Sequence, residues 1–346
     1  MKKFLSLLLI VLIALPLVGC KAKYEKFTDY SFDSFDTVTT VIGFEKDKET
    51  FDKNAQKVKD WLLEYHKLYD IYKSYDGVIN LYNLNRSQGK TVKVDNRIIN
   101  MLLVAKELYK KTDGKLNAAM GNVLSIWHDY RTHGLNNPEA AALPNKSDLQ
   151  DASRHINFDN VIINNKALTI LIKDKSLTLD VGAIAKGYAA EMVAQKMKDE
   201  GMTGYILNVG GNVKIVGKRP DGQKWTIGIE NPNNQSEQTY IEELELNSMS
   251  LVTSGSYQRF YTVNGKNYHH IIDPDTLYPA EYFASVSVLC EDSAIADGLS
   301  TTLFCLSYEE GKKLLEGFDD VCALWVTKDG KKLYSNGFEN YCKSKS

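Results

Sequence analysis

The sequence predicts an α+β protein in which mixed or antiparallel sheets are flanked by long helices. Several segments carry apolar residues at helical spacing, and many shorter segments alternate apolar and polar residues between turn signals. These helices and strands alternate too irregularly for a doubly wound parallel sheet. The glycine pair in "NVGGNV" opens no G-x-G-x-x-G helix, so the dinucleotide-binding fingerprint of such sheets is absent.

The first half of the chain predicts one strand and two long helices. Residues 35–44 alternate as a strand, and residues 51–72 carry apolar side chains at helical spacing. A second helix over 96–114 ends at Gly114, a residue suited to a helix stop. Glycine and proline interrupt residues 132–150, which predicts a long loop.

The second half predicts a strand meander followed by a helix and many strands. Residues 160–182 form the meander, which runs directly into a helix over 183–201. Asn264-Gly265 predicts a tight hairpin turn. Strands are then expected in the segments 204–218, 224–231, 240–246, 249–255, 259–273 and 284–290, before a helix pair around Thr301 and Leu314 and a hairpin over 322–337.

The N-terminus predicts export and anchoring. Lys2 and Lys3 precede an apolar run that is short for a membrane span, and "LVGC" after it resembles a bacterial lipobox. This resemblance implies a signal peptide over 1–19 and lipidation of Cys20, which would hold the protein on the extracytoplasmic side of the cell membrane. A polar tether over 20–31 and a domain of one or two subdomains over 32–340 follow. The alternative is a plain signal peptide with an incidental cysteine.

Composition and cysteine spacing exclude two ligand classes. The 346-residue chain has a formal net charge of −2 and no basic patch with interleaved aromatics, so nucleic acid is not expected as a ligand. No C-x-x-C pair is present, which argues against zinc. Cys290, Cys305 and Cys322 lie in apolar runs typical of a core, and the sequence leaves open whether any of them forms a disulfide.

Two segments combine glycine with polar residues. In "LDVGAIAKGYA", Asp180 is expected to end a strand, Gly182 permits an unusual backbone, and Lys186 begins a helix. Exposed backbone N–H groups there would suit phosphate oxygens, although a structural turn capped by Asp180 explains the same residues. "NVGGNV" permits close approach of a ligand or a neighbouring strand, or forms a bulge.

Two further segments carry candidate chemistry. His269 and His270 are adjacent on an expected strand, so their side chains point to opposite faces and at most one faces a site. Asp297 and Thr301 share one face of an expected helix. Taken alone, Asp297 favours a helix cap over a metal ligand, although such hard oxygen atoms suit Mg²⁺.

Together these segments resemble the ApbE-type flavin transferases, FAD:protein FMN transferases. The resemblance runs from about Phe32 to about Gly337 and includes a fainter match in "GKLNAAMGNVLSIWHDYR". It departs from the family at Phe35-Asp36-Thr37, where Met-Gly-Thr is usual, and at Leu277, where glycine is usual. The motifs that carry it, in family order, are "LDVGAIAKGYA", "NVGGNV", "KRPDGQKWTIGIENP", "TSGSYQRF", "HHIIDPDT" and "ADGLSTTLF".

The resemblance implies a set of site residues. Asp297, Thr301 and the backbone carbonyl of Ala183 would hold Mg²⁺, and His270 would lie near the reacting centre as the general base, with Asp273 and Asp180 as alternatives. The residues implied around FAD are Phe35, Tyr75, Lys115, Leu116, Asn117, Asp180, Lys186 and Ile272.

The activity implied by the family is Mg²⁺-dependent transfer of FMN from FAD, the substrate, to a Thr or Ser hydroxyl of an acceptor protein, with release of AMP. The expected acceptors are proteins of extracytoplasmic, flavin-dependent electron transfer. Two alternatives remain at this stage. One is an FAD pyrophosphatase that releases FMN and AMP, and the other is a lipoprotein that binds FAD without chemistry.

Overall fold

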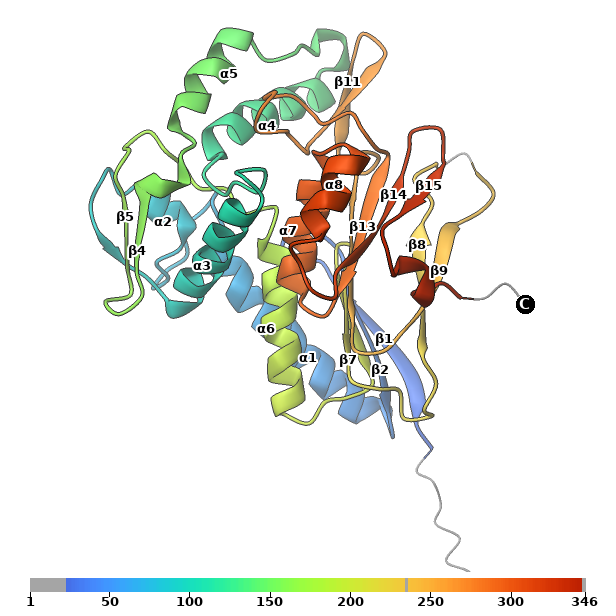
Figure 1. Ribbon diagram of the computed structural model, residues 1–346. Helices are drawn as coiled ribbons and strands as arrows, with labels where there is room; N and C mark the ends of the chain where they lie inside the picture. Colours follow the sequence, from blue (N-terminus) through green and yellow to red (C-terminus); the bar gives the residue numbers. More distant parts are fainter. Residues whose placement is uncertain (1–22, 234–235, 344–346) are drawn as a thin grey trace, which may run out of the picture.

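An eight-stranded sheet forms the centre of the computed structural model, which describes residues 23–233 and 236–343 (Figure 1). All neighbouring strands in it pair antiparallel, so the predicted α+β class is confirmed with antiparallel rather than mixed sheets. Cys20 and the predicted signal peptide lie outside the described residues. In sheet order the strands are β1 (Glu25–Ser31), β2 (Thr39–Glu45), β6 (Tyr205–Val209), β7 (Asn212–Val216), β10 (Ser250–Gly255), β13 (Ser285–Cys290), β14 (Cys322–Val326) and β15 (Lys332–Tyr334).

Three helices cover one face of this sheet, namely α1 (Lys48–Tyr69), α6 (Ala185–Asp199) and α7 (Ser293–Phe304). The other face is covered by the hairpin of β8 (Trp225–Glu230) and β9 (Tyr240–Leu246) and by the short helix η4 (Phe338–Tyr341). Strand β6 shows why both faces are apolar: Tyr205 and Leu207 pack toward the helices, whereas Ile206 packs toward the hairpin.

Two smaller groups of elements extend the helical side. The first contains α2 (Leu81–Asn85), α3 (Asn96–Lys111) and a sheet of β3 (Val92–Lys93), β5 (Thr169–Ile172) and β4 (Val161–Asn164). Helix α8 (Tyr308–Leu315) belongs to neither group, because its Tyr308 ring packs against Trp325 of β14. The second group contains α4 (Gly121–Asn136), α5 (Lys146–Ala152), β11 (Phe260–Val263) and β12 (Lys266–His269). The single-turn helices η1 (Pro138–Ala140), η2 (Ser153–His155) and η3 (Phe158–Asn160) connect them.

Several local predictions are confirmed. Asn264 and Gly265 both have positive φ in the β11–β12 turn, and the helix pair α7 and α8 is followed by the β14–β15 hairpin. Cys290, Cys305 and Cys322 are buried, and the four described cysteines form no disulfide. Within the described ranges no helix is both long enough and apolar enough to cross a membrane.

Two predictions about loops were wrong. Residues 132–150 contain the end of α4 and most of α5, because Gly134 is a packing residue rather than a helix breaker: a Cβ there would lie 2.7 Å from the Tyr261 ring. The segment 20–31 is not only a tether, since β1 begins at Glu25 and pairs with β2. Phe27 packs against the core, and Asp29 pairs with Lys59 on α1 at 2.8 Å.

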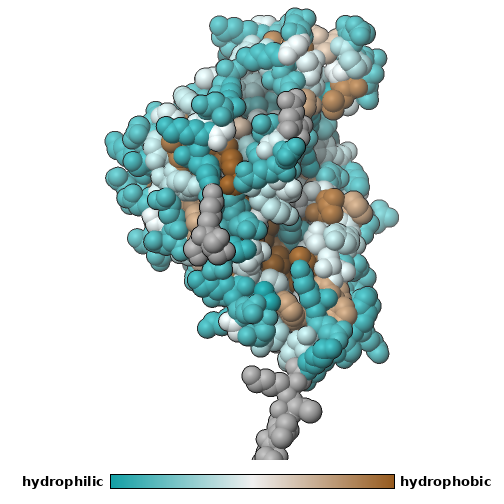
Figure 2. All heavy atoms as spheres, turned by 90° about the vertical axis from the view of Figure 1, so that its right-hand side faces the viewer, coloured by the Kyte–Doolittle hydropathy of each residue, from teal (hydrophilic) through white to brown (hydrophobic). Residues whose placement is uncertain are grey.

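The surface opposite the helices offers no broad apolar patch. Figure 2 shows the face that carries the β8–β9 hairpin, which is mostly hydrophilic with small separate apolar patches. Soluble proteins normally expose scattered apolar residues of this kind. The polar and close-packed contacts described next lie on the helical side of the sheet.

A buried ion pair anchors the start of α7. Glu191 of α6 accepts a hydrogen bond from the Ser293 backbone N–H at 2.9 Å and pairs with Lys214 of β7 at 2.8 Å. Both side chains are almost fully buried, and removal of one partner would leave an uncompensated charge. This pair ties two helices to the sheet at a single point.

Helices α6 and α7 touch where α6 has Gly187. We predict that Gly187→Ala destabilises the protein by about 1–3 kcal/mol, because a Cβ would collide with the Ser293 carbonyl oxygen and the Asp297 side chain. The free energy of unfolding in urea measures this. Gly317→Ala is the control, because its nearest non-neighbouring atom would lie at an ordinary 3.4 Å. Equal stability of the two variants would contradict the close contact.

Candidate functional site

A cavity of about 580 Å³ opens between the helical side of the central sheet and the α4 group of elements. Its walls come from segments far apart in the sequence. Among the predicted site residues in the described ranges, Tyr75 alone does not line the cavity. Those that do are Phe35, Lys115, Leu116, Asn117, Asp180, Ala183, Lys186, His270, Ile272, Asp297 and Thr301.

Asp297 lies in the middle of α7, so the interpretation of this residue as a helix cap was wrong. Asp292 is the N-cap, and its carboxylate accepts from two backbone N–H groups. Asp297 is 3% exposed, and its Oδ2 accepts from the Gly187 backbone N–H at 2.8 Å. Its Oδ1 lies 3.9 Å from Lys186 Nζ. Burial raises the pKa of Asp297, whereas Lys186 and the Gly187 hydrogen bond lower it, so a cation beside this carboxylate would stabilise its charged form.

Hydroxyl groups surround the same end of the cavity. Ser254 Oγ of β10 lies 2.8 Å from Ser300 Oγ and 3.5 Å from Thr301 Oγ1. In the described ranges no group of three or more His, Cys, Asp or Glu side chains could hold a metal. Asp297, Thr301 and Ala183 all line the cavity, and their carboxylate, hydroxyl and carbonyl oxygen atoms are hard ligands of the kind that would suit Mg²⁺ completed by water and substrate phosphates.

Asp180 and Lys186 flank the turn that precedes α6. Asp180 follows an extended segment rather than ending a strand, because β5 ends at Ile172. Its Oδ1 accepts from the Gly182 backbone N–H at 2.8 Å, which stabilises the turn but does not cap α6. Lys186 Nζ donates to the Gly182 carbonyl oxygen at 3.2 Å. Burial raises the pKa of Asp180, and nearby cations oppose this.

The glycine pair of "NVGGNV" forms the turn between β6 and β7. Gly210 and Gly211 both have positive φ, as a two-residue hairpin turn requires. Gly210 lines the cavity, and a Cβ there would collide with Thr37. The pair therefore permits close approach of a neighbouring segment, one of the alternatives that the sequence left open.

His269 and His270 point to opposite sides, as predicted. His269 uses both ring nitrogens: Nε2 donates to the Ala280 carbonyl oxygen at 2.7 Å, and Nδ1 accepts from the Ile271 backbone N–H at 3.2 Å. His270 lines the cavity, and its Nδ1 lies 3.3 Å from the Arg259 carbonyl oxygen, to which it donates. Nε2 of His270 is therefore the nitrogen with a free lone pair.

The surroundings of His270 keep it neutral. Burial lowers the pKa of His270 to about 3, together with the positive charges of Arg259, Arg131 and Lys186. An imidazole that is neutral at physiological pH can accept a proton. An anion bound among the same cations would raise this pKa and make the imidazole a stronger base.

Arg131 of α4 and Arg259 are cavity residues to which the sequence alone assigned no role. Arg259 Nη2 donates to the Asp36 carbonyl oxygen at 3.0 Å, and Arg131 Nη2 lies 3.1 Å from His128 Nδ1. In the described part of the chain neither guanidinium forms an ion pair with a carboxylate. Both residues lie in quoted motifs, but nothing in the sequence brings these motifs together. The cavity thus carries positive charge available to an anion.

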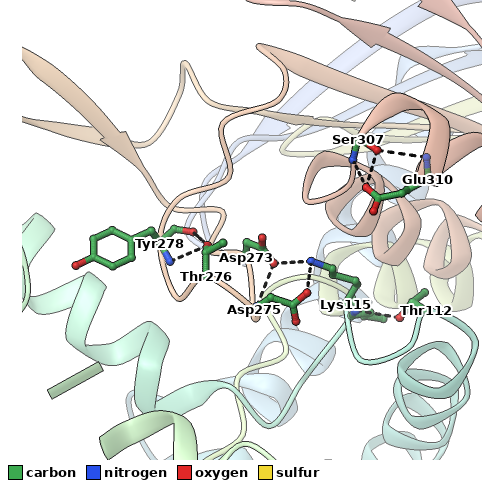
Figure 3. A network of polar contacts seen from close by, with 9 residues as sticks. Thr112, Lys115, Asp273, Asp275, Thr276, Tyr278, Ser307 and Glu310 are labelled. Carbon is green, nitrogen blue, oxygen red and sulfur yellow. Dashed lines mark hydrogen bonds and ion pairs between the residues drawn. The ribbon is translucent and has the colours of Figure 1, made fainter. Parts of the chain in front are cut away.

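Lys115 joins two walls of the cavity. Its Nζ lies 2.7 Å from Asp273 Oδ1 and 2.9 Å from Asp275 Oδ2, and Figure 3 shows both contacts. Asp273, an alternative base in the sequence analysis, is thus already paired with a cation. The next residue, Leu116, donates its backbone N–H to Thr112 Oγ1 at 3.0 Å. The Asn117 side chain likewise bonds to the backbone, at Ile156 and Ala119.

Tyr75 lies behind the cavity wall. Its hydroxyl donates to Asp70 Oδ2 at 2.8 Å and lies 3.2 Å from His66 Nε2. His66 lines the cavity beside Phe35, with the ring centroids 5.6 Å apart. Our sequence analysis did not single out His66, which is one polar residue on a long amphipathic helix.

Comparisons with known proteins agree on one family. The model of the ApbE family matches residues 35–325. The FAD:protein FMN transferase of Klebsiella pneumoniae is 30% identical over 80% of this chain and 82% of its own, and that of Haemophilus influenzae is 29% identical over 91% of both. The crystal structure of the ApbE protein from Thermotoga maritima, 26% identical, covers 93% of this chain and all of its own with a TM-score of 0.79. The chain belongs to the ApbE family.

Proposed function

We propose that this chain transfers FMN from FAD to a Thr or Ser hydroxyl of an acceptor protein, with Mg²⁺ bound and AMP released. One observation carries the proposal: a single cavity joins the buried Asp297 carboxylate to Lys186, Arg131 and Arg259. A substrate with a diphosphate and two ring systems matches this combination of charge and volume. The family relatives named FAD:protein FMN transferase support the same enzyme class.

The proposed reaction is a phosphoryl transfer. The acceptor hydroxyl oxygen attacks the FMN-side phosphorus and forms a new P–O bond, while the bond from this phosphorus to the bridging oxygen breaks. AMP leaves with the bridging oxygen, and FMN stays on the acceptor as a phosphoester. The hydroxyl proton passes to His270 Nε2, whose lone pair is free because Nδ1 donates to the Arg259 carbonyl oxygen.

The chain's own residues bind and orient the diphosphate. Asp297, Thr301 and the Ala183 carbonyl oxygen would hold Mg²⁺, which when bound supplies Lewis-acid stabilisation of charge on phosphoryl oxygens. Arg131 and Arg259 offer guanidinium donors that suit phosphate oxygens, since no carboxylate in the described residues occupies them. Lys186 adds a point charge between the metal ligands and Asp180.

The proposed location is the extracytoplasmic face of the cell membrane. It rests on the "LVGC" motif and the polar residues after it. The first described strand, β1, begins at Glu25, a few residues after Cys20. Lipid on Cys20 would therefore hold the domain close to the membrane, where acceptor proteins of extracytoplasmic electron transfer would meet it.

One incubation tests the proposal against its alternatives. Protein that begins at Lys23 is mixed with FAD, Mg²⁺ and a candidate acceptor, and the flavin products are separated. Covalent flavin on the acceptor supports transfer, free FMN supports a pyrophosphatase that uses water as nucleophile, and unchanged FAD supports a binding protein. Chelation of Mg²⁺ should stop turnover.

We predict that Asp297→Ala abolishes turnover, because it removes the formal negative charge beside the metal position. FAD binding should weaken less, since the flavin would contact cavity residues other than Asp297. Product formation at saturating Mg²⁺ and FAD binding are measured on the same preparation. Full transferase activity of this variant would contradict the metal assignment.

We predict that His270→Asn lowers the rate of transfer by roughly two to four orders of magnitude, the usual effect of a lost general base. His269→Asn is the matched control: it should reduce stability through its two backbone hydrogen bonds and should change the rate per folded molecule much less. Rates are compared at saturating FAD, Mg²⁺ and acceptor. Near-normal transfer by the His270 variant would move the search to Asp180, because Asp273 is paired with Lys115.

We predict that Cys20→Ser leaves an unlipidated precursor, because the modified thiol is lost. Mass spectrometry of protein extracted from membranes measures the lipid, and the domain expressed without residues 1–22 should keep its activity. Wild-type protein without lipid on Cys20 would favour a simple secreted enzyme.

A further inference from the structure

We propose that His66 is a positioning residue for the flavin pocket, which it serves by clamping the segment Phe35-Asp36 that forms one wall of the cavity. His66 would set the affinity for the ring system of the substrate without taking part in the chemistry. The effect on flavin rests on the proposed function, whereas the clamp itself can be tested on the protein alone.

The clamped segment has an unfavourable backbone. Phe35 has φ of 57° and Asp36 has φ of 49°, both in the left-handed region that non-glycine residues rarely adopt. Such a conformation is unfavourable for each residue and persists only where its surroundings enforce it. Side chains of both residues line the cavity, so a change in this backbone would change the cavity wall.

Two hydrogen bonds hold the segment from opposite sides. The Phe35 backbone N–H donates to His66 Nδ1 at 3.2 Å, and Arg259 Nη2 donates to the Asp36 carbonyl oxygen at 3.0 Å. The Phe35 ring also meets the His66 ring edge to face, with an interplanar angle of 75°. His66 therefore contacts both the backbone and the side chain of the same wall residue.

A relay of hydrogen bonds sets the tautomer of His66. Because Nδ1 accepts from Phe35, the ring proton lies on Nε2 and is donated to the Tyr75 hydroxyl at 3.2 Å. The Tyr75 hydroxyl in turn donates to Asp70 Oδ2 at 2.8 Å. Asp70 Oδ1 accepts from the Tyr72 and Lys73 backbone N–H groups, so the relay ends on a fixed carboxylate.

Burial of His66 favours the neutral ring that the clamp needs. Burial lowers its pKa, and so do Lys73 and Lys67, while Asp70 and Asp36 act in the opposite direction. A neutral ring keeps Nδ1 as an acceptor near neutral pH. His66 thus does what Tyr75 was expected to do, because it lies between Tyr75 and the cavity.

Three substitutions separate the clamp from general packing. In His66→Asn the amide oxygen stands near the position of Nδ1 and can still accept from Phe35. In His66→Gln the amide stands near Nε2, so the bond to Tyr75 can persist while the bond to Phe35 is lost. His66→Phe keeps the ring and loses both bonds. His133→Gln, an exposed histidine on α4, is the control.

The measurements are hydrogen exchange of the Phe35 amide, the FAD dissociation constant, kcat, and the midpoint of thermal unfolding. We expect exchange to accelerate roughly fivefold or more in the Gln and Phe variants, as loss of one hydrogen bond implies, and to stay near wild type in the Asn variant. FAD affinity should fall several-fold in the same two variants, with kcat at saturating FAD unchanged.

Two outcomes would show that His66 does not clamp Phe35, and either would overturn the proposal. One is an unchanged Phe35 exchange rate in His66→Phe, and the other is an Asn variant that behaves like the Phe variant in both exchange and FAD affinity. If exchange follows the expected order while wild-type protein binds no flavin, the clamp stands and the proposed function is wrong. If flavin transfer is normal but FAD affinity is equal in all variants, the positioning role is wrong and the proposed function stands.

Discussion

The contact between α6 and α7 is the constraint on which the site depends. At this contact Asp297 accepts from the Gly187 backbone N–H, and the absence of a Cβ at Gly187 lets the two helices meet. The same two helices carry Lys186 and Thr301, so one packing distance sets the spacing between the polar side chains of α7 and the lysine. The buried Glu191–Lys214 pair fixes this arrangement to the sheet. The second glycine of "LDVGAIAKGYA", Gly187, is thus explained by helix packing.

Most elements follow from local patterns, because apolar periodicity and turn residues report on the nearest neighbours in the chain. The β11–β12 turn at Asn264-Gly265 and the opposed histidines are such cases. Gly134 was wrongly predicted to interrupt the helix, since a glycine that admits the Tyr261 ring looks the same in sequence as a glycine that ends a helix. Edge strand β1 was missed because its pairing with β2 is a tertiary property.

The residues of the site also fall into those that sequence motifs indicate and those that only tertiary contacts reveal. Family motifs indicated the residues that we propose for the metal, and the structure brings these residues to one cavity. Arg131, Arg259 and His66 received no role from the sequence, because their contacts join distant segments, such as the Arg259 bond to the Asp36 carbonyl oxygen. Tyr75 shows the converse: a motif match gave its neighbourhood correctly but not its separation from the cavity by His66.

The cavity walls come from distant parts of the sequence, which determines when the cavity can form during synthesis and folding. The lining begins at Phe35 and ends at Thr301, and no short stretch between them contains both the residues that we propose for the metal and the Phe35 wall. A partly synthesised or partly folded chain therefore presents no competent pocket, because long-range contacts form late. If the chain is exported unfolded, it cannot carry a flavin with it. The dinucleotide must then be supplied on the far side of the membrane, after the last helix has docked.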